Sequence, residues 1–335
     1  KLHKQRLPGK KALIVISSGK STRANGYLDT VQDQLTQAGV EYAVFDKVSA
    51  NPVVDTVMDG AAFARANGCD FVLGLGGGSS IDAAKAIAMM APNEGNFWDY
   101  VYGGTGGGQK MKNKPLPIVA IPTTAGTGSE ATLVAVVADP ANRVKMEFLS
   151  YHLLPDAAVL DPRMTETLPP RITAATGFDA LVHAIEAATC LQRNPVSDAF
   201  AEKAMAQIVR ALPRAVQNGK DRKARMVMAN GSLLAGAAFS NSMVGLVHAI
   251  GHALGGVCHV AHGEAMTILL PAVMKYNLEK CKERYGELLL PLAGPEVYAA
   301  TPAELRAQKT IDTLVALRQQ LADLTGLPTT LSQTG

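Results

Sequence analysis

The chain has 335 residues, of which 47% are hydrophobic and 18% charged, as is typical of a globular protein that buries a large core. Its 32 basic and 29 acidic residues nearly balance, which disfavours a nucleic-acid-binding surface. No apolar run is long enough to span a bilayer and no signal-peptide pattern occurs, so we expect a cytoplasmic protein without a membrane partner. The four cysteines show no paired spacing and are expected to be free thiols.

Short β-rich runs alternate with helical patterns in the first half of the chain. The predicted strands and helices follow one another at residues 11–16, 27–38, 40–45, 53–66, 70–75, 80–90 and 117–121. Strands that are separated by helices pair in parallel through crossover connections. Residues 1–168 are therefore predicted to form a Rossmann-like α/β domain built on a parallel sheet.

The second half is rich in alanine, with apolar residues at every third or fourth position. This period predicts helices at residues 171–190, 196–212, 222–239, 243–256, 263–280 and 302–323. The prolines at 169–170, 195, 213 and 271 are expected at the joins or ends of these helices. We predict an all-α helical domain over residues 169–335.

A glycine-rich turn follows the third predicted strand. The strand runs into Gly76-Gly77-Gly78, then into Ser79 and a helix. Glycines let the backbone approach a phosphate, and a helix N-terminus presents free N–H groups to it. The spacing is not G-x-G-x-x-G, because Ser79 takes the final position, so an ordinary strand–helix turn is the alternative. A polar loop, Pro122–Glu130, follows the next strand, where ligands of open α/β sheets bind. Both features predict a dinucleotide-binding first domain.

The end of the first strand lacks the acidic residue that would select NAD through the ribose 2′-hydroxyl. Ser17, Ser18 and Gly19 stand there, with Lys20 and Arg23 close behind. Small hydroxyls and nearby cations can accept a 2′-phosphate, so NADP is favoured over NAD. A Walker A motif is rejected, because its upstream glycine would have to stand where an isoleucine does.

Five of the seven histidines fall between residues 183 and 262, in the predicted helical domain. Asp179 and His183 are four residues apart, as are His248 and His252, so each pair shares a helix face. The second pair resembles a zinc-protease helix but has no glutamate between its histidines, which disfavours hydrolysis. One aspartate and three histidines, His262 included, suit Fe²⁺ or Zn²⁺. The spacing leaves open whether His248 or His252 is a ligand.

Four motifs in order resemble those of the iron-containing (group III) alcohol dehydrogenases, which are related in fold to dehydroquinate synthase and glycerol dehydrogenase. They are Gly76-Gly77-Gly78-Ser79 with Asp82 and Lys85, the loop Pro122–Glu130, the segment Gly177–Glu186, and His248-x₃-His252 through His262-Gly263. The resemblance implies that Asp179, His183, His248 and His262 bind the metal, whereas His252 lies near the nicotinamide and relays a proton.

The resemblance also assigns residues to the dinucleotide. It implies contacts from Asn51, Gly77, Gly78, Ser79, Thr123, Thr124, Thr127 and Lys145. To these the cofactor prediction adds Ser17, Ser18 and Gly19 at the end of the first strand, and Asp82 of the first motif.

The predicted activity is hydride transfer between a primary alcohol or diol and NAD(P), with a metal that lowers the pKa of the alcohol. We expect a small-molecule alcohol or aldehyde substrate and a homodimer or higher homo-oligomer. One alternative is a zinc-dependent glycerol or polyol dehydrogenase of the same fold, whose sites typically use one aspartate and two histidines. A lyase of the dehydroquinate synthase type would need more basic residues. A catalytically silent nucleotide-binding protein is the alternative from another class.

Overall fold

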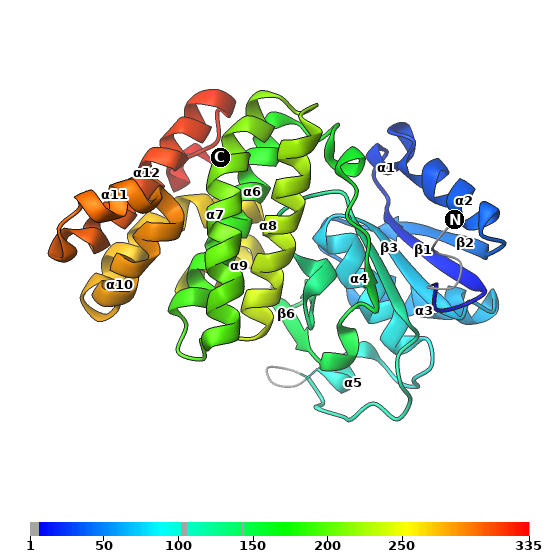
Figure 1. Cartoon of the computed structure of the whole chain (residues 1–335). Coiled ribbons are helices and arrows are strands. Elements are labelled where there is room, and N and C mark those ends of the chain that lie inside the picture. The colour runs from blue at the N-terminus through cyan, green and yellow to red at the C-terminus, as the bar shows by residue number, and fades with distance from the viewer. Residues whose placement is uncertain (1–6, 102–105, 143, 335) are drawn as a thin grey trace. The chain divides into compact units, whose positions relative to one another are not determined.

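The computed structural model describes residues 7–101, 106–142 and 144–334 (Figure 1). The chain divides into two compact units. The first, which we call the α/β unit, comprises the described residues up to Thr123 together with Ser129–Leu160. The second, the helical unit, comprises Thr124–Gly128 and the described residues from Asp161 onward. The domain boundary at residues 168–169 stays a prediction.

A five-stranded parallel sheet forms the centre of the α/β unit, with the strand order β2-β1-β3-β4-β7. Its strands are β1 (Lys11–Ser17), β2 (Glu41–Val48), β3 (Phe71–Gly76), β4 (Ile118–Pro122) and β7 (Ala157–Ala158). The strands β3 and β4 are buried along their whole length, as continuous apolar runs in a parallel sheet should be. The sheet confirms the predicted α/β class.

Helices lie between these strands, and those at residues 27–37, 54–66 and 78–90 occupy the predicted places. The helices are α1 (Ser21–Ala24), α2 (Tyr27–Gln37), α3 (Val54–Ala66), α4 (Gly78–Met90) and α5 (Phe97–Tyr100). After β1 the chain places β2 on one side and β3 on the other, so the strand order reverses beside β1. In open parallel sheets, ligands bind at the carboxyl ends of the strands next to such a reversal.

An antiparallel hairpin of β5 (Val134–Asp139) and β6 (Val144–Leu149) lies outside the main sheet and was not predicted. Alternate residues of β5 are buried, which is the period-2 pattern of a strand with one covered face. The backbone N–H of Ala138 donates to the carbonyl of Pro52 at 2.7 Å, which fixes the hairpin beside the loop after β2.

The helical unit contains no strand among its described residues, which confirms the predicted all-α class. Its helices are α6 (Pro170–Thr189), α7 (Pro195–Gln217), α8 (Arg222–Ser240), α9 (Leu246–Val257), α10 (His262–Ala293), α11 (Pro295–Ala300) and α12 (Arg306–Thr325). The alanine-rich α6 contacts α7, α8, α10 and α12. It is buried almost continuously from Thr173 to Ala188 because its small side chains allow close packing on every side.

The proline predictions were only partly right. Pro170 and Pro195 occupy the first turns of α6 and α7, where no backbone N–H is needed. Pro213 and Pro271, however, lie inside α7 and α10 rather than at helix ends. An internal proline costs a helix about 3 kcal/mol. Burial of apolar residues beyond each proline, such as Val216 in α7, offsets that cost and lets the helix continue.

Among the described helices, none combines the length and the apolarity that a bilayer crossing requires.

Candidate active site

The centre of α6 carries two buried polar side chains, Asp179 and His183, one helical turn apart. Their exposed fractions are 2% and 5%. His183 Nδ1 lies 3.7 Å from Asp179 Oδ1. A carboxylate buried this deeply is costly unless it is paired with a cation, so the pair indicates a site with a ligand.

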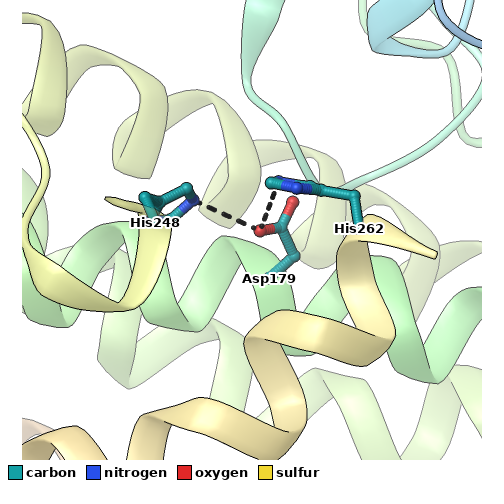
Figure 2. Close-up of side chains that lie close together, drawn as sticks. All are labelled: Asp179, His248 and His262. Carbon is teal, nitrogen blue, oxygen red and sulfur yellow. Dashed lines mark ion pairs between the residues drawn. The ribbon is translucent and has the colours of Figure 1, made fainter. Parts of the chain in front are cut away.

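Two further helices direct histidines at the same carboxylate oxygen (Figure 2). His248, in the first turn of α9, places Nε2 3.6 Å from Asp179 Oδ1, and His262, the first residue of α10, places Nε2 3.4 Å from it. One ligand atom from each of the three residues lies within 4.8 Å of the others. Ligands bound at about 2.1 Å to a single ion lie about 3 to 3.5 Å apart, so the three atoms are close to the arrangement that a metal needs.

Three atoms at this point are buried and have no hydrogen-bond partner among the described residues. They are Asp179 Oδ1, His183 Nδ1 and His248 Nε2. Buried polar atoms are nearly always bonded, and each one left unpaired costs about 1–3 kcal/mol. Three such atoms facing one point are the arrangement expected of a cation site.

His183 stands beside this group but outside it. Its ring stacks on Phe239, with centroids 4.6 Å apart and planes inclined by 18°, and its centroid is 4.3 Å from that of His248. The group within ligand distance is Asp179, His248 and His262. The structure thus gathers three of the four residues predicted to bind metal and places the fourth next to them.

The protonation of the cluster suits a cation. Burial alone would raise the pKa of Asp179, but the nearby histidines hold it well below its usual value. Burial lowers the pKa of His183 to about 3 and also lowers that of His262. Burial would lower the pKa of His248 as well, but the nearby carboxylates of Asp179 and Glu186 outweigh it and raise the pKa to about 9. The ionised carboxylate and the neutral rings of His183 and His262 are the forms that bind divalent metals, whereas His248 carries a proton that a metal would displace.

His252 occupies a different position from His248, although both are on α9. It is partly exposed, and its ring centroid lies 5.3 Å from that of His262 and 5.8 Å from that of His248. It is not part of the three-residue group within ligand distance. His252 therefore lies next to the cluster without entering it.

Glu186 is the last residue of the motif Gly177–Glu186, but no role was predicted for it. Its Oε2 lies 2.6 Å from Nδ1 of His248, on the side of the ring away from Asp179. The spacing contained a signal that was missed, because Glu186 follows Asp179 by two helical turns and so shares its face of α6.

The predicted phosphate turn lies at the carboxyl end of β3. Gly77 caps α4, and Ser79 stands in its first turn. Gly76 has a φ of 155°, and a Cβ on it would meet Ser80 Oγ at 2.4 Å, so glycine is required there. The backbone N–H of Thr123 donates to the carbonyl of Gly76 at 2.9 Å, which places the loop after β4 against this turn.

Two other residues predicted to bind the dinucleotide, Asn51 and Ser18, lie in segments that are bonded at this turn or at the neighbouring strand end. The hydroxyl of Ser79 donates to the carbonyl of Ala50 at 2.7 Å, which places the segment containing Asn51 beside the turn. Ser18 donates its backbone N–H to Val48 at the neighbouring strand end. Lys145 lies on β6, opposite Ala138. The remaining predicted contacts are Ser17 and Gly19 after β1, Gly78 in the first turn of α4, and Thr124 and Thr127 in the short segment assigned to the helical unit.

Asp82 and Lys85 of the first motif act within the α/β unit. Both carboxylate oxygens of Asp82 accept hydrogen bonds, one from Ser129 Oγ at 2.5 Å and one from the backbone N–H of Val136 at 3.1 Å. The ammonium of Lys85 donates to Thr132 O, Thr132 Oγ1 and the carbonyl of Val134 at 2.8–2.9 Å. These bonds join α4 to β5. Asp82 therefore has a structural role in this unit. Its predicted contact with a cofactor stays a prediction.

A parallel sheet with a glycine turn, together with helices that carry an acid–histidine cluster, is the combination expected of a metal-dependent, dinucleotide-linked oxidoreductase. Two family models match consecutive parts of the sequence. "Iron-containing alcohol dehydrogenase" matches residues 2–162, and "Fe-containing alcohol dehydrogenase family, C-terminal" matches residues 173–335. The chain belongs to the iron-containing alcohol dehydrogenase family, as its four motifs predicted.

Individual relatives agree with this assignment. Long-chain-alcohol dehydrogenase 1 of Geobacillus thermodenitrificans is 40% identical over 309 residues, which are 92% of this chain and 77% of that protein. The 1,3-propanediol dehydrogenase of Klebsiella pneumoniae is 39% identical over 331 residues, 99% of this chain and 83% of that protein. A crystal structure of 1,3-propanediol oxidoreductase matches with a TM-score of 0.90 at 38% identity, covering 99% of this chain and 83% of that one. The predicted alcohol dehydrogenase activity is thereby confirmed.

Proposed function

We propose that this enzyme oxidises a primary alcohol or diol, or reduces the matching aldehyde, with a divalent metal held by Asp179, His248 and His262 and with His183 as the fourth ligand. The observation that carries the metal site is the convergence of three buried atoms that have no hydrogen-bond partner. An iron ion held there would supply Lewis acidity toward an alcohol oxygen, and a bound dinucleotide would supply the hydride acceptor.

His252 is proposed to carry the alcohol proton to solvent. Its ring lies beside those of His248 and His262 and is partly exposed, so it can reach both the cluster and water. A ligand and a relay differ in what their removal does. We expect His252→Ala to retain the metal and lose turnover, whereas a ligand variant loses the metal itself.

The test is metal analysis of protein purified anaerobically and reloaded with Fe²⁺. Asp179→Ala and His262→Ala are expected to lose the metal, while His252→Ala binds it like the wild type and loses about 10²- to 10⁴-fold in kcat. His152→Ala, at an exposed histidine of the α/β unit, is the matched control and should change neither quantity. Metal loss in His252→Ala would contradict the relay role, and metal retention in Asp179→Ala would contradict the site.

A three-ligand zinc site is the second candidate, because the group within ligand distance holds one aspartate and two histidines. The variant His183→Ala separates the two candidates. A four-ligand site loses metal affinity in this variant, whereas a three-ligand site keeps it. Elemental analysis of the wild type shows at the same time whether iron or zinc is retained.

The proposed substrate class is supported by the names of the relatives. Their names include long-chain-alcohol, 1,3-propanediol and methanol dehydrogenases, which supports a primary alcohol or diol. Comparing kcat/KM across short alcohols, diols and their aldehydes tests this proposal. Activity confined to secondary alcohols would contradict it.

For the cofactor we propose NAD(P), with a preference for NADP, because no acidic side chain stands at residues 17–19. One structural observation counts against the preference, since Arg23 pairs with Asp46 at 2.6 Å and is less available to a 2′-phosphate. Relatives of both kinds exist, an NAD-dependent methanol dehydrogenase and an NADPH-dependent butanol dehydrogenase. The ratio of kcat/KM for NADPH to that for NADH decides the preference.

Cytoplasmic location and a homodimeric or higher assembly also stay proposals. The four cysteines are free, which agrees with a reducing compartment. Light scattering of the purified protein measures the assembly directly, and a monomeric mass would contradict it.

A further inference from the structure

Glu186 is buried on the face of α6 that carries the candidate ligands. It follows Asp179 by seven residues and His183 by three, and its exposed fraction is 5%. It is not one of the three residues whose ligand atoms lie within 4.8 Å of one another. Its carboxylate instead contacts the helix that carries His248.

One oxygen of this carboxylate determines which nitrogen of His248 holds the proton. Oε2 lies 2.6 Å from Nδ1 of His248, and both atoms are buried. A carboxylate oxygen only accepts, so Nδ1 donates. Once the ring has given up its second proton, its lone pair is on Nε2, which is the atom that faces Asp179 Oδ1 at 3.6 Å. This is the tautomer that a metal requires.

The other oxygen holds the beginning of α9. Oε1 accepts the backbone N–H of Val247 at 2.6 Å, in the first turn of the helix. The N-cap residue, Gly245, has no side chain that could do this. A Cβ on Gly245 would lie 2.9 Å from Oε1, so the glycine also leaves room for the carboxylate. A side chain of α6 thus caps α9.

A cavity beside Glu186 means that packing does not enclose its side chain on every side. This cavity of about 70 Å³ is lined by Glu186 together with Asn277, Cys281 and Tyr285. Room for a few water molecules would let a side chain that lost its bonds turn away from His248. The two hydrogen bonds therefore keep the carboxylate against α9.

We infer that Glu186 is a positioning residue of the metal centre, which fixes both the tautomer of His248 and the place of α9 on α6. The inference rests on the proposed metal site. Hydrogen-bond partners of metal-binding histidines typically change metal affinity or activity by about 10- to 100-fold when they are replaced.

The isosteric variant Glu186→Gln tests the role. Two N–H donors, from Val247 and His248, need two acceptor oxygens, and glutamine offers one. If the amide accepts from Val247, its NH₂ group faces Nδ1 and drives the proton to Nε2, where the metal binds. We expect the affinity for Fe²⁺ or Co²⁺, measured by chelator competition, to fall about 10- to 100-fold. The visible spectrum of the Co²⁺ protein should change as well.

Three further variants complete the experiment. Glu186→Asp keeps both acceptors and should recover part of the affinity. Gly245→Ala pushes the carboxylate from its place without altering it, and should weaken metal binding even if Glu186→Gln fails to fold. The control Glu202→Gln makes the same chemical change at an ion pair with Arg284 and should bind metal like the wild type.

The outcomes separate this inference from the proposed metal site. If neither the wild type nor Glu202→Gln binds metal, the metal site itself is wrong. If both bind metal and Glu186→Gln matches them in affinity and Co²⁺ spectrum, only the positioning role is overturned.

Discussion

Two groups of buried ionisable side chains, one in each unit, differ in how their polar atoms are bonded. In the α/β unit, Lys85 uses all three of its N–H donors and Asp82 uses both of its oxygens. In the helical unit, Asp179 and His248 each leave a buried atom without a hydrogen-bond partner. Both groups lie within motifs that were predicted from the sequence to be functional.

The difference separates a structural role from a ligand site. A fully bonded buried network stabilises the fold without needing a ligand. Buried atoms that converge without partners reduce stability until something binds them. The bonding state of the buried polar atoms therefore distinguishes the two groups, although residue type and burial do not.

The largest expected effect concerns the bonded group. Replacing Lys85 with methionine removes three buried hydrogen bonds and the cation near Asp82, so the free energy of unfolding should fall by about 3–5 kcal/mol. Metal content should not change, because the metal cluster lies in the other unit. Urea denaturation and elemental analysis measure the two quantities. The exposed Lys110→Met is the control, and a loss as small as that of the control would contradict the structural role.

A second prediction concerns pH. Burial raises the pKa of Glu130 from 4.5 to about 7. The folded protein therefore holds this proton more tightly than the unfolded chain. The resulting stability is fully present below pH 4.5 and falls by up to about 3 kcal/mol as the pH rises through 7. Glu130→Gln cannot ionise, so its stability relative to the wild type should rise by that amount between about pH 5 and pH 8. If the free energy of unfolding changes with pH equally in the two proteins, the predicted role of Glu130 is contradicted.

The unbonded group gives a slightly smaller effect of opposite sign. Metal at about 100 times its Kd should raise the free energy of unfolding by about 2.7 kcal/mol, because only the folded site binds it. Thermal unfolding of the metal-free protein with added Co²⁺, and again after a chelator, measures the gain. Asp179→Ala should show none of it. An equal gain in that variant would place the metal elsewhere.

The fold was largely predictable because its signals are local. The four longer strands of the sheet and most helices follow hydrophobic periods, and they were placed within a few residues. The hairpin β5–β6 was missed although β5 alternates between buried and part-buried residues, and α10 continues through Pro271. Both depend on what packs against the segment, which a local pattern does not contain.

The candidate site was predictable as far as helical spacing reaches. Asp179 and His183 are one turn apart, and the histidines of α9 are likewise one turn apart. The convergence of three helices at one carboxylate oxygen depends on tertiary packing, which spacing does not show. The choice of His248 over His252 as a ligand therefore needed the family resemblance. The spacing places Glu186 on the face of α6 that carries Asp179. Its bonds to α9, like those of Asp82 to β5, join distant segments, and spacing alone does not indicate them.

The ligand atoms come from the middle of α6 and from the first turns of α9 and α10. An ion bound to all three would join segments that are far apart in the chain, and neither α9 nor α10 could then open locally while the ion stayed fully coordinated. We expect the exchange of backbone amide protons in the first turn of α9 and the release of the ion to share one rate-limiting motion. Retention of the metal would then be a kinetic property of α9 as much as an equilibrium property of its ligands.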